Sequence, residues 1–130
     1  MATYVKINGV QYPAVITGKM HDRDWNDRPS KAIQLEMTYE QAVSTFVDDI
    51  AWSILQEHEV MSVEEREVVN EETGEVEIVH EHVMVPSYDE YDNSEYNLAG
   101  DIIDHRNGYI TVKMGKMTAE EMLAMIEEVL

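Results

Sequence analysis

The alternation of apolar and polar side chains predicts several short strands, beginning with a hairpin at the N-terminus. Thr3 to Ile7 is rich in β-favouring residues, and the Asn8-Gly9 pair after it suits the positive φ angles of a two-residue hairpin turn. Val10 to Ile16 is therefore predicted to be the return strand. Pro13 cannot donate a ladder hydrogen bond, so we expect this strand to lie at a sheet edge or to bulge at Pro13.

A polar segment and two further strands follow. Residues 17–30 contain glycine, proline and many charged residues, which predicts a loop that Trp25 pins to the body. Lys31 to Met37 alternates and predicts a half-buried strand. Ile50 to Leu55 carries apolar residues on both faces, which is typical of a central strand.

Helical periodicity appears twice, each time after a capping box. Thr38 with Gln41 predicts the start of a helix over residues 39–47, and Thr118 with Glu121 predicts the start of a terminal helix over residues 119–130. The apolar face of the first helix comprises Ala42, Val43, Phe46 and Val47. The apolar stripe of the second comprises Met122, Leu123, Met125, Ile126, Val129 and Leu130. Such stripes need a sheet face to cover.

Two more strands complete the pattern. Tyr96 to Asp104 is predicted to be a strand with a bulge or close backbone approach at Gly100, and Tyr109 to Met114 returns after a turn that ends in Asn107-Gly108. Tight turns join most strands, which implies antiparallel pairing. We therefore expect one α+β domain over residues 1–130, a mostly antiparallel sheet covered by two amphipathic helices.

The segment from residue 57 to residue 95 is an acidic insertion in this domain. It holds fourteen of the 27 acidic residues of the chain, and Arg66 is its only lysine or arginine. Valine-rich flanks surround the turn-forming residues 70–74, which predicts a long β-hairpin arm. Its base is expected to reach the body. Because like charges across a strand pair are destabilising, its tip is expected to be mobile or to need a cation or partner for order.

A tyrosine-rich acidic loop is expected after the arm, which Pro86-Ser87 should end. Tyr88, Tyr91 and Tyr96 alternate there with acidic residues. Aromatic residues are enriched at protein interfaces, and carboxylates suit arginine on a partner. The loop is either a binding surface or a segment whose tyrosines pack beneath it.

Composition narrows the function classes. The net charge of −18 repels nucleic acid and anionic membranes and attracts basic proteins, although acidic proteomes also contain such chains. Cysteine is absent, so disulfides and thiolate metal sites are excluded. The start of the chain, Met1 to Lys6, lacks the features of a signal peptide, and no apolar run is long enough to span a bilayer.

The sequence contains only weak signals of a catalytic or metal-binding site. No nucleophile motif or phosphate-binding glycine loop is present, and Asp104-His105 falls in a predicted turn. His80 and His82 should share a strand face, where His58 could join them on a metal ion. Because a rigid scaffold with a second shell is missing, we predict no metal site. Because no catalytic motif is present, we also predict no cofactor and no enzymatic activity. Pairs of carboxylates arise by chance among 27 acidic residues, so a hydrolase that uses such a pair stays an alternative.

A calcium loop is also rejected. Residues 22–27 alternate acidic side chains, but Asp27 stands where an EF-hand needs glycine and Ile33 where it needs glutamate. A polar loop in which Arg23 and Arg28 bind its own aspartates is expected instead.

Three stretches of the chain resemble known proteins, and none of them lies in the predicted hairpin of the arm. They are residues 4–9, residues 32–40 and residues 91–108, with the sequences YVKING from Tyr4, AIQLEMTYE from Ala32 and YDNSEY from Tyr91 onward. The chain resembles a group of small phage and prophage proteins of Gram-positive bacteria. The resemblance implies a phage context and no site residues.

Three functions are compatible with these features. The first is a phage-encoded inhibitor of a host defence protein, acting in the host cytoplasm, whose arm imitates nucleic acid in the basic channel of a nuclease such as a CRISPR effector. Its expected contacts are Glu64, Glu65, Glu67, Glu71, Glu72, Glu75, Glu77, Tyr88, Asp89, Glu90, Tyr91 and Asp92. The second is an oligomeric structural or tail-assembly component of the virion. The third is a sponge for a nucleotide signal, with Arg23, Arg28, Lys31 and Arg106 as ligands.

Overall fold

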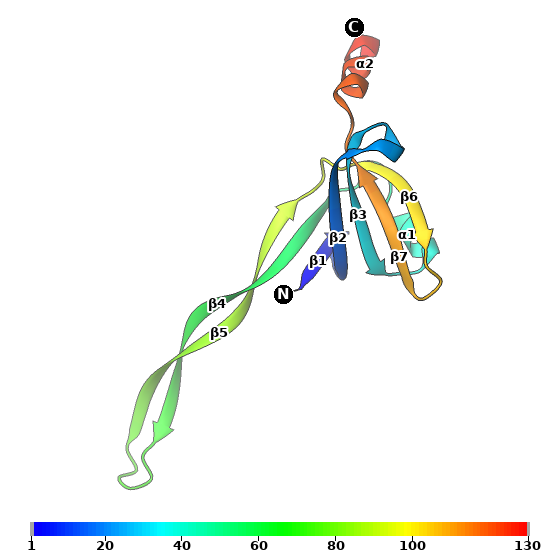
Figure 1. Ribbon diagram of the computed structural model, residues 1–130. Coiled ribbons are helices and arrows are strands. Elements are labelled where there is room, and N and C mark those ends of the chain that lie inside the picture. Colours follow the sequence, from blue (N-terminus) through cyan, green and yellow to red (C-terminus); the bar gives the residue numbers. More distant parts are fainter. Residues whose placement is uncertain (1, 130) are drawn as a thin grey trace.

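The computed structural model describes residues 2–129, with side chains as far as residue 127, and its architecture is mostly antiparallel β-sheet (Figure 1). Seven strands form one sheet in the order β5-β4-β1-β2-β3-β7-β6. The elements in chain order are β1 (Thr3–Ile7), β2 (Val10–Asp22), the 3₁₀ turn η1 (Arg23–Trp25), β3 (Arg28–Glu36), α1 (Tyr39–Thr45), β4 (Trp52–Val69), β5 (Val76–Asp92), β6 (Leu98–Asp104), β7 (Tyr109–Gly115) and α2 (Ala119–Val129). Every strand pair is antiparallel.

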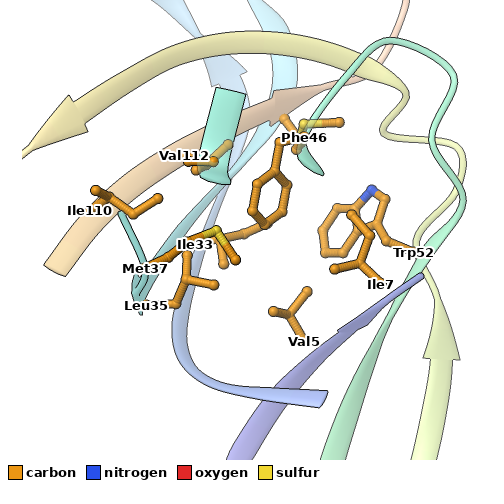
Figure 2. Packing of buried hydrophobic residues seen from close by; sticks show 11 residues of the cluster. Val5, Ile7, Ile33, Leu35, Met37, Phe46, Trp52, Ile110 and Val112 are labelled. Atoms are coloured by element: carbon orange, nitrogen blue, oxygen red, sulfur yellow. The ribbon is translucent and has the colours of Figure 1, made fainter. Parts of the chain in front are cut away.

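The hydrophobic core lies between the sheet and α1 (Figure 2). The central strands supply the aliphatic side chains Val5, Ile7, Ile33, Leu35, Ile110, Val112 and Met114. The other side of the core is closed by Phe46 and Met37, which flank α1, and by Trp52 from β4. The expectation of an α+β fold covered by two helices is therefore wrong, because only α1 covers this sheet.

Helix α2 stands away from the body instead of packing on it (Figure 1). The capping box predicted at Thr118 and Glu121 is confirmed in both directions. The apolar side chains of the helix that the structure describes are exposed, namely Met122, Leu123, Met125 and Ile126. The predicted stripe also included the side chain of Val129 and residue Leu130, which lie outside the described part of the chain.

Helix α1 begins at the predicted capping box, formed by Thr38 and Gln41. It is shorter than expected and ends at Thr45, so Phe46 follows it as the C-cap. Phe46 is buried as predicted, whereas Val47 is exposed. The apolar face is therefore narrower than the periodicity indicates.

Strands β2 and β3 extend far into the predicted loop over residues 17–30. Gly18 pairs with Lys31 and Lys19 with Ser30, and the register shifts only after Lys19. Pro13 is neither an edge residue nor a bulge. It is the last residue of β2 that pairs with β1, and the next residue pairs with β3, so the missing N–H falls where the strand changes neighbours.

Trp25 pins the β2–β3 connection to the sheet, as predicted. Its ring lies against two glycines, where a Cβ on Gly100 would come within 2.8 Å and one on Gly115 within 2.5 Å of ring atoms. The register of β6 shifts between Ala99 and Ile102, which confirms the predicted irregularity at Gly100. The Arg28 guanidinium stacks 4.9 Å from the centre of the Trp25 ring.

A fully buried carboxylate ties β2 to β3 and β7. Asp22 is 0 % exposed, lies 2.8 Å from the Lys113 ammonium and accepts a 2.8 Å hydrogen bond from the Ser30 hydroxyl. Arg28 binds Glu121 in α2, so the expected pairing of this loop's arginines with its own aspartates is wrong for Arg28. Hydrogen bonds from Lys113 and then Ser30 outweigh the effect of burial and hold the pKa of Asp22 at about 2.

The low pKa of Asp22 leads to a prediction about the stability of the fold in acid. Asp22 ionises more readily in the folded protein than in the unfolded chain. The stabilisation that the Asp22 carboxylate gives to the folded state is therefore fully present above about pH 4 and disappears as the pH falls through about 2. We expect Asp22→Asn to lower the urea midpoint near neutral pH. It should also flatten the fall in midpoint between these two pH values. Urea titrations of both proteins, with exposed Glu36→Gln as control, test this, and parallel curves would contradict it.

Candidate binding arm

The β4–β5 hairpin leaves the body as a two-stranded ribbon (Figure 1). Strand β1 covers β4 only as far as the pair of Thr3 with Gln56 and a hydrogen bond from the Glu57 amide to Ala2. We call residues 58–87 the arm. Twelve residues of β4 lie beyond this point, which corresponds to roughly 40 Å. The predicted long hairpin is confirmed. The expectation that its base reaches the body is wrong.

The tip of the arm closes on the predicted turn. The Gly74 amide donates to the Asn70 carbonyl at 2.7 Å, and the Asn70 amide donates to the Glu75 carbonyl at 2.8 Å. The Asn70 side chain accepts a hydrogen bond from the Glu72 amide, and Gly74 takes the positive φ of 71° that the turn requires. Strand pairing continues up to Val69 and Val76, so the ribbon is regular to its end.

A buried asparagine anchors the end of β5, beyond the base of the arm. Asn93 follows β5, and its amide donates to the Trp52 carbonyl at 2.9 Å. Its side chain donates to the Tyr91 carbonyl and accepts a hydrogen bond from the Lys31 ammonium. The Lys31 ammonium also lies 4.9 Å from the centre of the Tyr96 ring. These contacts fix the direction in which the ribbon leaves the sheet.

The arm divides into two chemically different halves. We call residues 64–81 the distal half and residues 58–63 with 82–87 the proximal half. The distal half holds eight glutamates, one arginine and one histidine. The proximal half holds one glutamate and the apolar residues Val60, Met61, Val63, Val83, Met84, Val85 and Pro86. The acidic charge is therefore concentrated in the part farthest from the body.

The cross-strand register limits the repulsion expected in the distal half. Glu65 faces His80, Glu67 faces Ile78 and Glu77 faces Val68. Only Glu64 and Glu81 oppose each other among its strand pairs, and Arg66 lies 2.6 Å from Glu81. Because like charges rarely oppose one another, the strands can pair along their whole length.

The carboxylates do not form a row on one face. Strand residues alternate between the two faces, so Glu64, Glu77 and Glu81 lie on one side of the ribbon and Glu65 and Glu67 on the other. Glu71, Glu72 and Glu75 surround the tip. A partner would therefore meet negative charge on both sides of the arm.

Most of this charge has no basic neighbour in the chain. Within residues 2–129, the distal glutamates form only two ion pairs, Arg66 with Glu81 and His80 with Glu65 at 3.9 Å. Several body cations already contact acidic residues of the body, including Lys6 with Glu90, Lys113 with Asp22 and Lys116 with Glu95.

The tyrosine-rich segment is part of a strand and not the expected loop. Strand β5 runs through Pro86-Ser87 to Asp92, and only residues 93–97 form a connection. Tyr88 and Tyr91 are exposed, and the Tyr88 ring meets Tyr4 edge-on at 6.0 Å. The neighbouring acids are partly engaged. Asp89 lies 3.3 Å from His58, and Glu90 accepts a hydrogen bond from the Ser53 hydroxyl.

Asp92 turns back on its own chain. Its carboxylate accepts hydrogen bonds from the hydroxyl and then the amide of Ser94, which lower the pKa of Asp92. The distal glutamates thus offer more free charge than Asp89, Glu90 and Asp92. The second predicted contact surface is reduced mainly to its tyrosine rings.

The histidines of the arm do not converge. His80 and His82 share a face of β5, as the strand period predicts. His58 pairs with Ser87 and falls on the other face, where its Nδ1 lies 3.3 Å from Asp89 without the geometry of a hydrogen bond. Across residues 2–129, no group of three metal-ligating side chains is suitably placed for an ion.

The remaining chemical candidates are separated in space. His105 bonds the Thr111 hydroxyl at 2.8 Å, while Asp104 accepts from the Arg106 amide, so the two do not act as a pair. Arg28 and Arg106 lie near opposite ends of β3, because the turn that contains Arg106 bonds Met37 through Gly108. Arg23, Arg28, Lys31 and Arg106 are therefore not brought together as a nucleotide site.

Comparison with protein-family models, with curated proteins and with solved structures found no match. Neither helix among residues 2–129 has the length and apolar character needed to cross a membrane.

Proposed function

We propose that this protein is a non-enzymatic binding protein that inserts the distal half of its arm into a basic groove of another protein. The observation that carries this proposal is the concentration of eight glutamates, largely without basic neighbours, at the end of a ribbon about 40 Å long. Such a surface attracts cationic partners and repels anionic ones. Charge on both faces of the ribbon suits a groove that encloses it.

Grooves lined with lysine and arginine are typical of nucleic-acid-binding proteins. The resemblance to phage proteins favours a host defence nuclease as the owner of the groove. The arm would then compete with nucleic acid for the channel, in the host cytoplasm, and the protein would act as an anti-CRISPR-like inhibitor.

A charge-reversal variant tests this proposal. We expect the protein to displace DNA from a purified, guide-loaded Cas9-type nuclease, and the displacement to weaken at least tenfold between about 50 and 200 mM salt. Reversal of Glu64, Glu67, Glu71 and Glu72 to lysine should weaken it by about a hundredfold or more. Fluorescence anisotropy of labelled DNA measures both effects.

The matched control reverses four exposed acids of the body, Glu36, Glu40, Asp101 and Glu120, with the same change in net charge. It should retain most of the inhibition. Equal loss in both variants would mean that net charge alone acts, and no displacement by the wild type would remove the inhibitor proposal.

A second candidate function is a structural component of a phage particle. The outer edge of β4 beyond Glu57 and the outer edge of β5 pair with no strand in the described chain. Free edges are templates for pairing with other chains, and isolated two-stranded ribbons are marginally stable in water. This candidate predicts copurification with virions that persists at high salt.

A further inference from the structure

Helix α2 presents an uncovered apolar surface in a fixed orientation. Met122, Leu123, Met125 and Ile126 are 43–59 % exposed, and the helix projects from the body (Figure 1). Arg28 nevertheless holds its first turn firmly. The buried guanidinium donates to both carboxylate oxygens of Glu121, at 2.6 and 3.2 Å, and stacks on Trp25. The helix is therefore an oriented projection and not a free tail.

The proximal half of the arm presents a second uncovered apolar surface. Met61, Val63 and Met84 belong to one face of the ribbon and are all more than half exposed. Glu59, His82 and Pro86 belong to the same face. A monomer seldom leaves two separate apolar surfaces of this kind in water.

The two surfaces match in size but cannot meet within one molecule. An eleven-residue helix is about 16 Å long, and a five-residue stretch of ribbon such as 59–63 is also about 16 Å long. Figure 1 shows α2 and the arm projecting from different ends of the body. We propose that α2 of one copy packs on the proximal half of the arm of a second copy, in a head-to-tail contact.

The distribution of charge favours this contact over a contact between two α2 helices or between α2 and the distal half of the arm. The described side chains of α2 include Glu120, Glu121 and Glu127 and no lysine or arginine, so two α2 helices would bring acidic rims together. The distal half of the arm would repel α2 for the same reason. On the face that carries Met61 and Met84, the proximal half holds one acid, Glu59, together with His82. It is the part of the arm that an acidic helix can approach.

A head-to-tail contact propagates into a ring or a filament, because each copy retains one free helix and one free arm surface. The contact is apolar while each chain carries a net charge of −18, so added salt should strengthen it by screening repulsion. It does not depend on the proposed basic partner, because the distal half remains uncovered.

The test mixes two variants that each lack one of the two surfaces. Leu123→Ser/Ile126→Ser removes the helix surface, and Met61→Ser/Met84→Ser removes the arm surface. In sedimentation velocity at about 0.5 M salt, we expect concentration-dependent oligomers for the wild type and monomers for each variant alone. An equimolar mixture should form dimers and nothing larger, because only one intact contact is available. Val15→Ser/Ile103→Ser, in exposed apolar residues elsewhere, should behave as the wild type.

Other outcomes would overturn the inference. A helix variant that still self-associates would indicate arm-to-arm pairing, and monomers of the wild type throughout would show that neither surface binds a second copy. Failure of the mixture to form dimers would exclude a head-to-tail contact, provided that circular dichroism shows both variants folded. Loss of self-association would leave inhibition of the nuclease intact, so the two proposals fail separately.

Discussion

Replacing Glu59–Pro86 by an Asn-Gly turn should abolish nuclease inhibition and self-association while the body remains folded. The replacement joins His58 to Ser87, which already face each other, so the new two-residue turn has a compatible register. The hydrophobic core draws no side chain from the arm, and the Asn93 anchor lies outside the deletion. Thermal unfolding followed by circular dichroism and the two binding assays measure the outcome.

The charge-reversal and apolar variants are the internal controls for this deletion, because each removes one activity and retains the whole ribbon. Inhibition by the shortened protein would place the binding surface on the body. A shortened protein that is unfolded would show that the arm contributes to the stability of the sheet.

Phe46→Ala should lower the stability of the fold more than any of the other point substitutions proposed above. Phe46 is the only phenylalanine, is 2 % exposed and packs between α1 and the sheet (Figure 2). Removing a buried phenyl ring leaves a cavity and costs about 3–5 kcal/mol. For a domain of this size, the midpoint of thermal unfolding should fall by roughly 10–20 °C. Differential scanning calorimetry measures it.

Val47→Ala is the matched control for this substitution, because Val47 is the next residue and is exposed. We expect its midpoint to stay within a few degrees of the wild type. Similar losses for both substitutions would mean that Phe46 does not support the core as the structure indicates.

Local sequence signals predicted the features that depend on neighbouring residues. Asn8 and Gly9 take positive φ angles of 54° and 76° in the first hairpin, and the Thr38 capping box forms as the spacing predicts. The irregularity at Gly100 was also predictable, because a glycine within a strand pattern often marks a bulge or close approach.

Features that depend on distant residues could not be predicted. The polar residues around Gly18 predict a loop, yet they pair with β3, and Asp22 at the end of β2 lies against Lys113 from β7, far along the chain. The stripe of α2 indicates that the helix needs cover, but periodicity does not identify which surface provides it. The fold class could not be predicted for the same reason, because it depends on whether α2 packs on the sheet, and α2 does not.

The candidate site was predicted in composition but not in geometry. The turn around Gly74 and the valine-rich flanks predicted a hairpin. The faces that the glutamates occupy follow from the register, which the sequence leaves open. Continuation of β5 through Pro86 to Asp92 was missed, because proline usually ends a strand and is tolerated at an edge such as this one.

The anchor at Asn93 makes the arm a lever. Across a span of about 40 Å, a rotation of ten degrees at the base would move the tip by roughly 7 Å. A small rotation at the base would therefore become a large displacement of the glutamates at the turn. Contacts of the body at the base of the ribbon thus determine the direction in which its glutamate-rich tip points.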